Sequence, residues 1–239
     1  MKRVCDKYGA LLILDEVMSG MGRSGTLHAW EQEGVVPDIQ TIGKGLGGGY
    51  AAVSGVLMNE KIVDALDKGT GAFRHGQTYQ GHPVGCAAAL AVQKYIQKNN
   101  LVENVRIRGE QLEKRLREYL GDHPNVGDIR GKGLFWGVRS PFTLPFLINT
   151  NRDTQIEFVK DKSTKTPFDP SLAVGVGVQD LAQTPKYSFS IYAGGGTVDG
   201  KKGDHVLLAP MYTSTEEEID EIARRTRDVV VEYFERLRE

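Results

Sequence analysis

The sequence predicts an α/β fold, with a mostly parallel sheet and its helices in the first part of the chain and a smaller α+β part after it. Ala10 to Leu14 is a continuous apolar run, which is typical of a strand buried on both faces. Up to about residue 100, short apolar strands alternate with helical segments. Beyond that point, two long amphipathic helices enclose a further strand pair.

The first part is expected to contain three strands and two helices. The strands cover residues 10–14, 39–42 and 52–58, and a short helix over residues 25–33 lies between the first two. Pro83 opens the second helix, because proline is favoured at the first helical position, and small residues continue it to Gln97. Residues before Ala10 resemble the end of a helix, so we expect the chain to begin within a domain.

The second part opens with a surface helix over residues 101–120, where leucines and valines recur at helical spacing among many charges. Residues 121–125 end this helix, and residues 126–138 are expected to form a strand pair or a bent strand. The last helix covers residues 215–237, with Ser214 or Thr215 as its cap and three glutamates in its first turn.

Composition excludes several classes of partner. The chain has 239 residues, and its 30 basic and 31 acidic side chains give a net charge of -1, so nothing favours nucleic acid or an anionic membrane surface. No apolar run approaches membrane-spanning length, and the first residues do not form a signal peptide. Cys5 and Cys86 lack metal-ligand spacing, so we expect reduced thiols and a cytoplasmic location, with mitochondria left open.

Lys44 lies in the glycine run TIGKGLGGG, which follows the second expected strand. A phosphate-binding loop requires the lysine after its glycines and next to a serine or threonine, and Lys44 has neither feature. A lysine that forms a Schiff base must be closely approached, and flanking glycines provide the space for a planar cofactor. The alternative is that Lys44 is a solvated charge in a turn.

Asp15 stands at the carboxyl end of the first expected strand, where open α/β sheets gather ligand chemistry. An acid there and a lysine after the neighbouring strand can face one crevice. Pyridoxal phosphate requires this pair, since a carboxylate that holds its ring nitrogen protonated makes the cofactor an electron sink. The alternative is that Asp15 and Glu16 only end the strand, and spacing alone leaves both interpretations open.

Three blocks carry a family resemblance: LLILDEVMSGMGRSG, PDIQTIGKGLGGGYAAVSGVLM and HGQTYQGHPVGCAAA. In order and interval they resemble the class III aminotransferases, which are ω-aminotransferases among the fold-type I pyridoxal-phosphate enzymes. The resemblance extends through RGKGLFWG, GGGTVDGKKGDHVLLAP and the last helix. It implies that residues 1–100 are part of the cofactor-binding large domain and that residues 101–239 are the small C-terminal domain.

The resemblance also implies a role for four residues. Lys44 would be the internal aldimine lysine and proton shuttle, and Asp15 would pair with the pyridinium nitrogen of pyridoxal 5'-phosphate. Val17 would pack on the ring, and Thr78 would donate its hydroxyl to the phosphate across a dimer interface. The alternatives are that Val17 belongs to the core, that Thr78 is a turn residue, and that His75 and His82 pack within loops. The spacing of the histidines forms no zinc site.

The sequence departs from the family at two contacts. Met18 stands where several relatives have a glutamine near the cofactor hydroxyl, so that contact is expected to be absent. Leu207 stands where relatives with α-carboxylate substrates often have an arginine, so a bidentate carboxylate clamp is missing there. Arg23 is typical of the family and is expected to be structural.

The implied reaction is ping-pong transamination between an amine or amino acid and a keto acid or aldehyde, through the Lys44 aldimine, in a homodimer of the complete protein. Racemisation or decarboxylation at the same lysine, and a catalytically inactive fragment, are the alternatives. Family members are roughly twice as long, and the resemblance implies that the upstream half, with its phosphate turn and stacking aromatic residue, is missing here.

Residues 138–155 interrupt a strand that otherwise reads smoothly from GKGLFWG to IEFVKDK. These 18 residues correspond to 54 nucleotides without a stop codon. Val138 must be encoded by a codon that begins with GT, and Gln155 can be encoded by CAG. We hypothesise that this atypical insertion is a retained intron of the fungal type, whereas the alternative is a real surface insertion, which loops tolerate.

Overall fold

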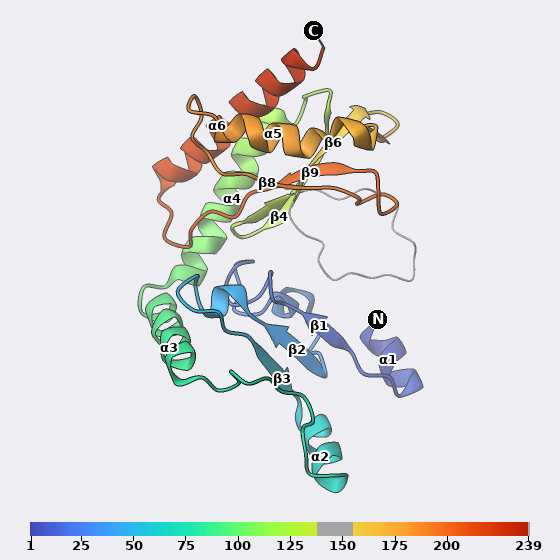
Figure 1. Cartoon of the computed structure of the whole chain (residues 1–239), viewed down its shortest axis with the longest axis vertical. Coiled ribbons are helices and arrows are strands. Elements are labelled where there is room, and N and C mark those ends of the chain that lie inside the picture. Colours follow the sequence, from blue (N-terminus) through green and yellow to red (C-terminus); the bar gives the residue numbers. More distant parts are fainter. Residues whose placement is uncertain (138–154, 239) are drawn as a thin grey trace. The chain divides into compact units, whose positions relative to one another are not determined.

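The computed structural model describes residues 1–137 and 155–238, and the chain divides into two compact units, Met1–Glu103 and Asn104–Glu239 (Figure 1). Apart from Gln155, the expected insertion over residues 138–155 lies outside the described residues. The domain roles expected for residues 1–100 and 101–239 stay predictions.

A three-stranded sheet lies in the first unit, in the order β1-β2-β3. β1 (Ile13–Asp15) and β2 (Ile39–Ile42) are parallel, whereas β2 and β3 (Gly55–Met58) are antiparallel. The expected mostly parallel sheet is therefore found for one strand pair only. The physical reason is that the segment between β2 and β3 contains no α-helix to carry the chain back across the sheet.

The helices of this unit bury few of their residues. They are α1 (Lys2–Tyr8), the 3-10 helices η1 (Ala29–Glu33) and η2 (Lys44–Leu46), α2 (Glu60–Lys68) and α3 (Pro83–Lys98). α1 and α2 contain no buried residue, and α3 buries only Ala89 and Ile96. Pro83 begins α3 as predicted, and α2 was not predicted.

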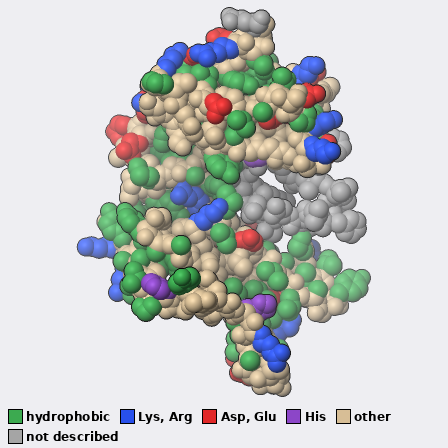
Figure 2. Space-filling model, in the orientation of Figure 1, with side chains coloured by type: hydrophobic (Ala, Val, Ile, Leu, Met, Phe, Trp, Pro, Cys, Tyr) green, Lys and Arg blue, Asp and Glu red, His purple; other side chains and the backbone are tan. Residues whose placement is uncertain are grey.

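The prediction that the run from Ala10 to Leu14 is buried on both faces is wrong. Leu12 and Leu14 are buried, but Leu11 and Ile13 are 44% and 58% exposed. Side chains alternate across a strand, so the described residues cover only one face of β1. Hydrophobic side chains consequently remain at the surface of this unit (Figure 2).

The second unit combines an antiparallel sheet with three long helices. Its elements are α4 (Leu101–Leu120), β4 (Val126–Lys132), β5 (Phe135–Gly137), β6 (Gln155–Asp161), β7 (Thr166–Pro167), η3 (Pro170–Leu172), α5 (Val174–Gln183), β8 (Tyr192–Gly194), β9 (Asp204–Leu207) and α6 (Glu216–Arg236). In the main sheet, β4 pairs with β5 and with β6, β9 pairs with β6 and with β8, and β7 pairs with β6. All of these pairs are antiparallel, as expected for an α+β part.

The large hydrophobic core lies in this second unit. One face of the sheet supplies Ile129, Ile156, Phe158 and Val206, all nearly inaccessible to solvent. The apolar stripes of α4, α5 and α6 pack against that face. Phe234 of α6 stacks on Phe168 and meets Phe158 edge to face. α6 begins with a capping box in which Thr215 and Glu218 bond each other's backbone amides.

β5 and β6 both pair with β4, and their registers overlap at one residue of β4. Arg130 of β4 is paired with Gly137 of β5 and also with Gln155 of β6. On the other side, β9 pairs with β6 through Ile156 and Val206, and the next rung joins Trp136 of β5 to Leu208. The backbones of these last two residues exchange both hydrogen bonds, at 3.0 and 2.9 Å.

Candidate active site

Asp15 and Thr41 lie opposite each other where the parallel strands β1 and β2 end. The Thr41 hydroxyl donates to Oδ1 of Asp15 at 2.9 Å, and the Val17 amide donates to the same oxygen at 3.0 Å. Within the described residues, Oδ2 of Asp15 accepts no hydrogen bond, and the side chain is exposed. One carboxylate oxygen is thus fixed by the protein, while the other is available to a ligand.

Glu16 points to the opposite side of the strand and is buried. Its carboxylate accepts hydrogen bonds from the amides of Ala29 and Trp30, at 2.8 Å each, and from the Gln40 side chain at 2.9 Å. Gln40 in turn accepts from the indole of Trp30 at 3.0 Å and contacts the ring of His28 at 2.9 Å. This buried network ties the loop after Asp15 to β2.

The loop that carries Lys44 is fixed by its backbone. Lys44 has a φ of 39°, in the left-handed region that a non-glycine residue rarely adopts. Gln93 of α3 donates to the carbonyls of Gly45 and Leu46, at 3.2 and 3.1 Å. A Cβ on Gly47 would lie 2.3 Å from the carbonyl oxygen of Ala51, so this glycine is required for the close turn.

Val17 and the start of the lysine loop are neighbours. A Cβ on Gly43 would lie 3.2 Å from Cγ1 of Val17, so glycine allows the two segments to approach. The Lys44 side chain is exposed and has no hydrogen-bond or ion-pair partner in the described part of the chain. The structure thus brings the backbone beside Lys44 next to Val17, whose amide contacts Asp15.

These features fit pyridoxal phosphate in part. The Asp15 carboxylate has one oxygen available for a ring nitrogen. The Lys44 amine, which has no partner among the described residues, is suited to an aldehyde. Val17 is β-branched and lies beside a glycine, so it is suited to a ring face. Thr78 is exposed, in the turn before α3, and the structure shows no contact of its side chain with Asp15, Val17 or Lys44 among the described residues.

The two histidines near Thr78 have structural roles or none. His82 is the N-cap of α3, where its Nδ1 accepts from the Gly85 amide at 3.4 Å, and His75 is exposed beside Phe73. Residues 1–137 and 155–238 contain no cluster of histidine, cysteine and carboxylate side chains suited to a metal ion.

Sequence reasoning missed Thr41, Glu16, Gln40 and Gln93 as parts of this site. A usable signal exists for Gln40, a long polar side chain in the short strand Ile39–Ile42, at a position that the structure buries. Thr41 carries no comparable signal, because its place opposite Asp15 depends on the register of β1 and β2.

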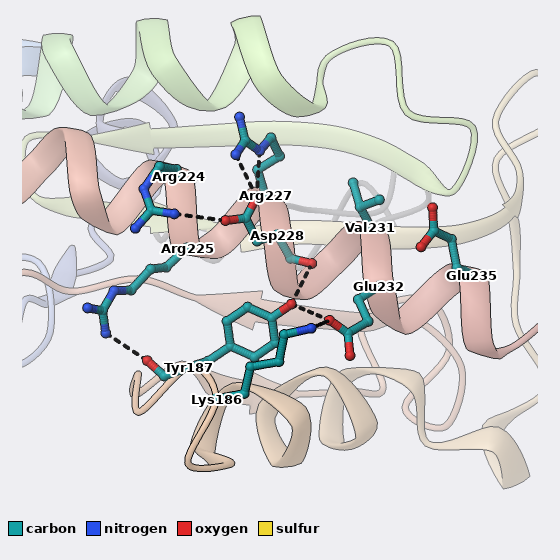
Figure 3. Close-up of a pocket in the computed structure, with 9 residues that line it drawn as sticks. All are labelled: Lys186, Tyr187, Arg224, Arg225, Arg227, Asp228, Val231, Glu232 and Glu235. Atoms are coloured by element: carbon teal, nitrogen blue, oxygen red, sulfur yellow. Dashed lines mark hydrogen bonds and ion pairs between the residues drawn. The ribbon is translucent and has the colours of Figure 1, made fainter.

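A separate groove of about 750 Å³ lies between α6 and the segment after α5 (Figure 3). Its charges pair among themselves: Lys186 and the Tyr187 hydroxyl contact Glu232, and Arg224 and Arg227 contact Asp228. The groove contains none of the residues predicted for the site. Most of the charged side chains that line it are paired with one another, so they give no sign of a ligand.

Comparisons with known proteins identify the family. The model of the class III aminotransferases matches residues 1–152. An aminotransferase of Gibberella zeae is 52% identical over 231 residues, which are 97% of this chain and 42% of that protein. An uncharacterized aminotransferase of Schizosaccharomyces pombe is 47% identical over 93% of this chain and 44% of its own length.

Solved structures agree with these relatives. An amine transaminase from an uncultivated Pseudomonas species, in its pyridoxal-phosphate-bound form, superposes with a TM-score of 0.80 at 31% identity, over 96% of this chain and 46% of that one. This superposition confirms the α/β fold of the chain, which corresponds to part of that transaminase. The chain spans less than half the length of the relatives it matches. In residues 1–137 and 155–238, no helix has the length and hydrophobicity required to cross a membrane.

Proposed function

This chain belongs to the class III aminotransferase family, and we propose that it carries the lysine-bearing part of a pyridoxal-phosphate-dependent aminotransferase site. The observation that supports this most is the pairing of Asp15 with Thr41 at the strand ends, three residues before Lys44. In this assignment, residues 1–100 are part of the cofactor domain and residues 101–239 are the small domain.

Four residues would hold the cofactor. Lys44 would bind its aldehyde carbon, Asp15 would accept a hydrogen bond from its ring nitrogen through Oδ2, and Val17 would cover the ring. Thr78 would donate its hydroxyl to the phosphate. When bound, pyridoxal phosphate supplies an electron sink for the carbon next to the substrate nitrogen.

The roles of the side chains follow from their chemistry. The Lys44 amine, once displaced by the amino substrate, can remove a proton from the substrate carbon and return it at another position. The charge of Asp15 would keep the ring nitrogen protonated. Since an amine and a keto acid or aldehyde would use the same site in turn, the kinetics would be ping-pong.

The substrates are an amine or amino acid and a keto acid or aldehyde. Leu207, at the end of β9, is apolar at the position where an arginine would clamp an α-carboxylate, so the two partners are proposed only by class. Assembly as a homodimer is proposed for the complete protein.

The test is to add pyridoxal phosphate to the purified chain and record the absorbance band at about 400 nm that a lysine-bound cofactor gives. We expect Lys44→Ala to abolish the band. Lys61→Ala, which removes another exposed lysine of the first unit, is the matched control and should retain it.

Product analysis separates the alternatives. Conversion of an amine to a carbonyl compound supports transamination. A Lys44-dependent band with racemised or decarboxylated amino acid, and no carbonyl product, would assign another reaction at the same lysine. Absence of the band from the unmodified chain would show that the chain does not bind the cofactor by itself.

A further inference from the structure

Thr41 and the Val17 amide together fix one oxygen of Asp15. Both donate to Oδ1, at 2.9 and 3.0 Å, and the Thr41 carbonyl also accepts from the Glu16 amide at 3.0 Å. Thr41 is thus bonded to the strand end through its backbone and its side chain. A carboxylate held through one oxygen cannot rotate freely about its Cβ–Cγ bond.

We propose that Thr41 is a positioning residue of the site, because its hydroxyl sets the plane of the Asp15 carboxylate and so keeps Oδ2 available to the cofactor ring nitrogen. This inference rests on the proposed function of Asp15. No cofactor is required for the first part of the test, since Thr41 acts on the carboxylate whether or not a ligand is bound.

The variants are Thr41→Val, which keeps the β-branched shape and removes the hydroxyl, and Thr41→Ser, which keeps the hydroxyl. In the chain without cofactor, we expect hydrogen exchange of the Val17 amide to become several-fold faster in Thr41→Val and to stay unchanged in Thr41→Ser. With pyridoxal phosphate, the Kd should rise about tenfold in Thr41→Val and be restored in Thr41→Ser.

The outcomes distinguish this inference from the proposed function. If Asp15→Asn weakens cofactor binding while Thr41→Val leaves the Kd and the Val17 exchange unchanged, Thr41 has no positioning role. If the band survives in Lys44→Ala, the proposed function fails and the role of Thr41 toward the cofactor fails with it, whereas the Val17 exchange still tests whether Thr41 fixes the Asp15 carboxylate.

A second inference comes from the strand registers of the other unit. Gly137 and Gln155 both face Arg130, and they are 18 positions apart in the sequence. Toward β9, the rung of Trp136 and Leu208 continues that of Ile156 and Val206 with the same offset of 18 positions. The register with β4 and the register with β9 therefore give the same offset of 18 positions.

This offset equals the length of the segment from residue 138 to residue 155. If Gly137 were followed directly by Ile156, β5 and β6 would form one unbroken strand between β4 and β9. Gly137 would then face Arg130 alone, and the other described rungs would be retained. A segment of 17 or 19 residues would not do this, because a slip of one residue turns each side chain to the opposite face.

We infer that residues 138–155 are absent from the form of the protein for which this sheet is suited, through removal of the corresponding 54 nucleotides from the message. The inference rests on the described strands on either side of the segment.

Tryptic peptides from the source organism test this inference without any assumption about folding. The spliced form gives GLFWGIEFVK, which joins residues 133–137 to residues 156–160. The unspliced form gives GLFWGVR and SPFTLPFLINTNR instead. We expect the joined peptide to dominate, together with messages that lack the 54 nucleotides. Dominance of SPFTLPFLINTNR would establish a real insertion and overturn the inference.

Deletion variants test the register itself. Removal of residues 138–155 should raise the folding equilibrium constant by roughly tenfold or more, because β5 and β6 no longer have to be brought together across intervening chain. Removal of residues 138–154 is the matched control, since it would turn Ile156 and Phe158 out of the core. Equal stability of the two deletions would contradict the register argument.

Discussion

The buried side chain of Glu16 holds the segment after Asp15, the start of η1 and the strand β2 together. Three donors, the amides of Ala29 and Trp30 and the side chain of Gln40, depend on its buried carboxylate. Glu16→Ala would leave the two amides without an acceptor and remove one hydrogen bond of Gln40, so we expect a loss of about 2–4 kcal/mol in the free energy of unfolding of the first unit. Denaturant unfolding followed by Trp30 fluorescence measures it.

The matched control for this prediction is Glu33→Ala. Glu33 lies on the short helix η1, together with Ala29 and Trp30, but its side chain is exposed. Its removal should therefore change the free energy of unfolding by less than about 0.5 kcal/mol. Equal effects of the two variants would show that the loss reflects charge alone and not the buried hydrogen bonds.

Glu157 gives the second unit a specific pH dependence. Burial is the main cause that raises its pKa from 4.5 to about 7, while Arg130 and Lys165 lower it and Asp128 raises it. A carboxyl group with a raised folded pKa stabilises the fold below its unfolded pKa, and this contribution is lost as the pH rises from about 4.5 to 7. Glu157→Gln stays neutral throughout.

The expected outcome is a difference that grows with pH. At pH 4, Glu157→Gln and the unmodified chain should be similarly stable, and at pH 8 the variant should be more stable by about 2–3 kcal/mol. Glu235→Gln, at an exposed site of α6, should show no such trend. A constant difference across this range would contradict the prediction. His205 titrates in both proteins, with its pKa lowered by burial to about 4, and cancels in the comparison.

At this scale, the sequence was informative where chemistry restricts the choice of residue. Asp15 and Lys44 were found because few residue types can hold a ring nitrogen or bind an aldehyde, although their roles stay predictions. Glu16 and Thr41 were missed because their roles depend on partners that are distant in sequence, Ala29 for Glu16 and the opposing strand for Thr41. A single sequence does not show such pairing.

Two helical glycines provide a test of how the elements pack. A Cβ on Gly109 of α4 would lie 2.2 Å from the carbonyl oxygen of Gly133, in the turn between β4 and β5. A Cβ on Gly85 of α3 would meet nothing within 4 Å. The same substitution should therefore have opposite effects at the two positions.

We expect Gly109→Ala to destabilise its unit by more than about 2 kcal/mol, because helix and turn must separate. Gly85→Ala should stabilise α3 by about 0.5–1 kcal/mol, since alanine loses less backbone entropy in a helix. Thermal unfolding by circular dichroism, with the Trp30 and Trp136 signals, assigns each effect to its unit. Stabilisation by both alanines would show that α4 does not contact the turn.

Elements with a strong periodic pattern were predictable, and short ones were not. α4, α6 and the start of α3 were predicted within a few residues because their apolar stripes and caps are local signals. β8 and β9 have three and four residues and show no period, so nothing local marks them. The predicted helix over residues 25–33 is the 3-10 helix η1, which begins at Ala29, where Glu16 caps its first amides.

For the whole molecule, the uneven distribution of buried apolar residues is the dominant feature. The large buried cluster is contributed by elements of the second unit, whereas the first unit buries scattered residues such as Leu12, Leu14 and Ile42. Hydrophobic burial is the main favourable term in folding, so the units are expected to differ in stability. Composition alone could not reveal this, because 40% hydrophobic residues describes the chain as a whole.

The two tryptophans allow this difference to be measured, because Trp30 lies in the first unit and Trp136 in the second. Trp136→Phe leaves Trp30 as the single reporter, and Trp30→Phe leaves Trp136. We expect the Trp30 signal to change at a lower denaturant concentration than the Trp136 signal, by roughly 1 M urea or more, given a gap of a few kcal/mol and typical m-values. Trp136 is 2% exposed and belongs to the core of the second unit, so Trp136→Phe itself is destabilising, and the gap counts only if the unmodified chain also unfolds in two steps. Coincident transitions in the two variants would mean that the units unfold as one cooperative body, in which case the sparse burial of the first unit would be compensated by coupling to the second.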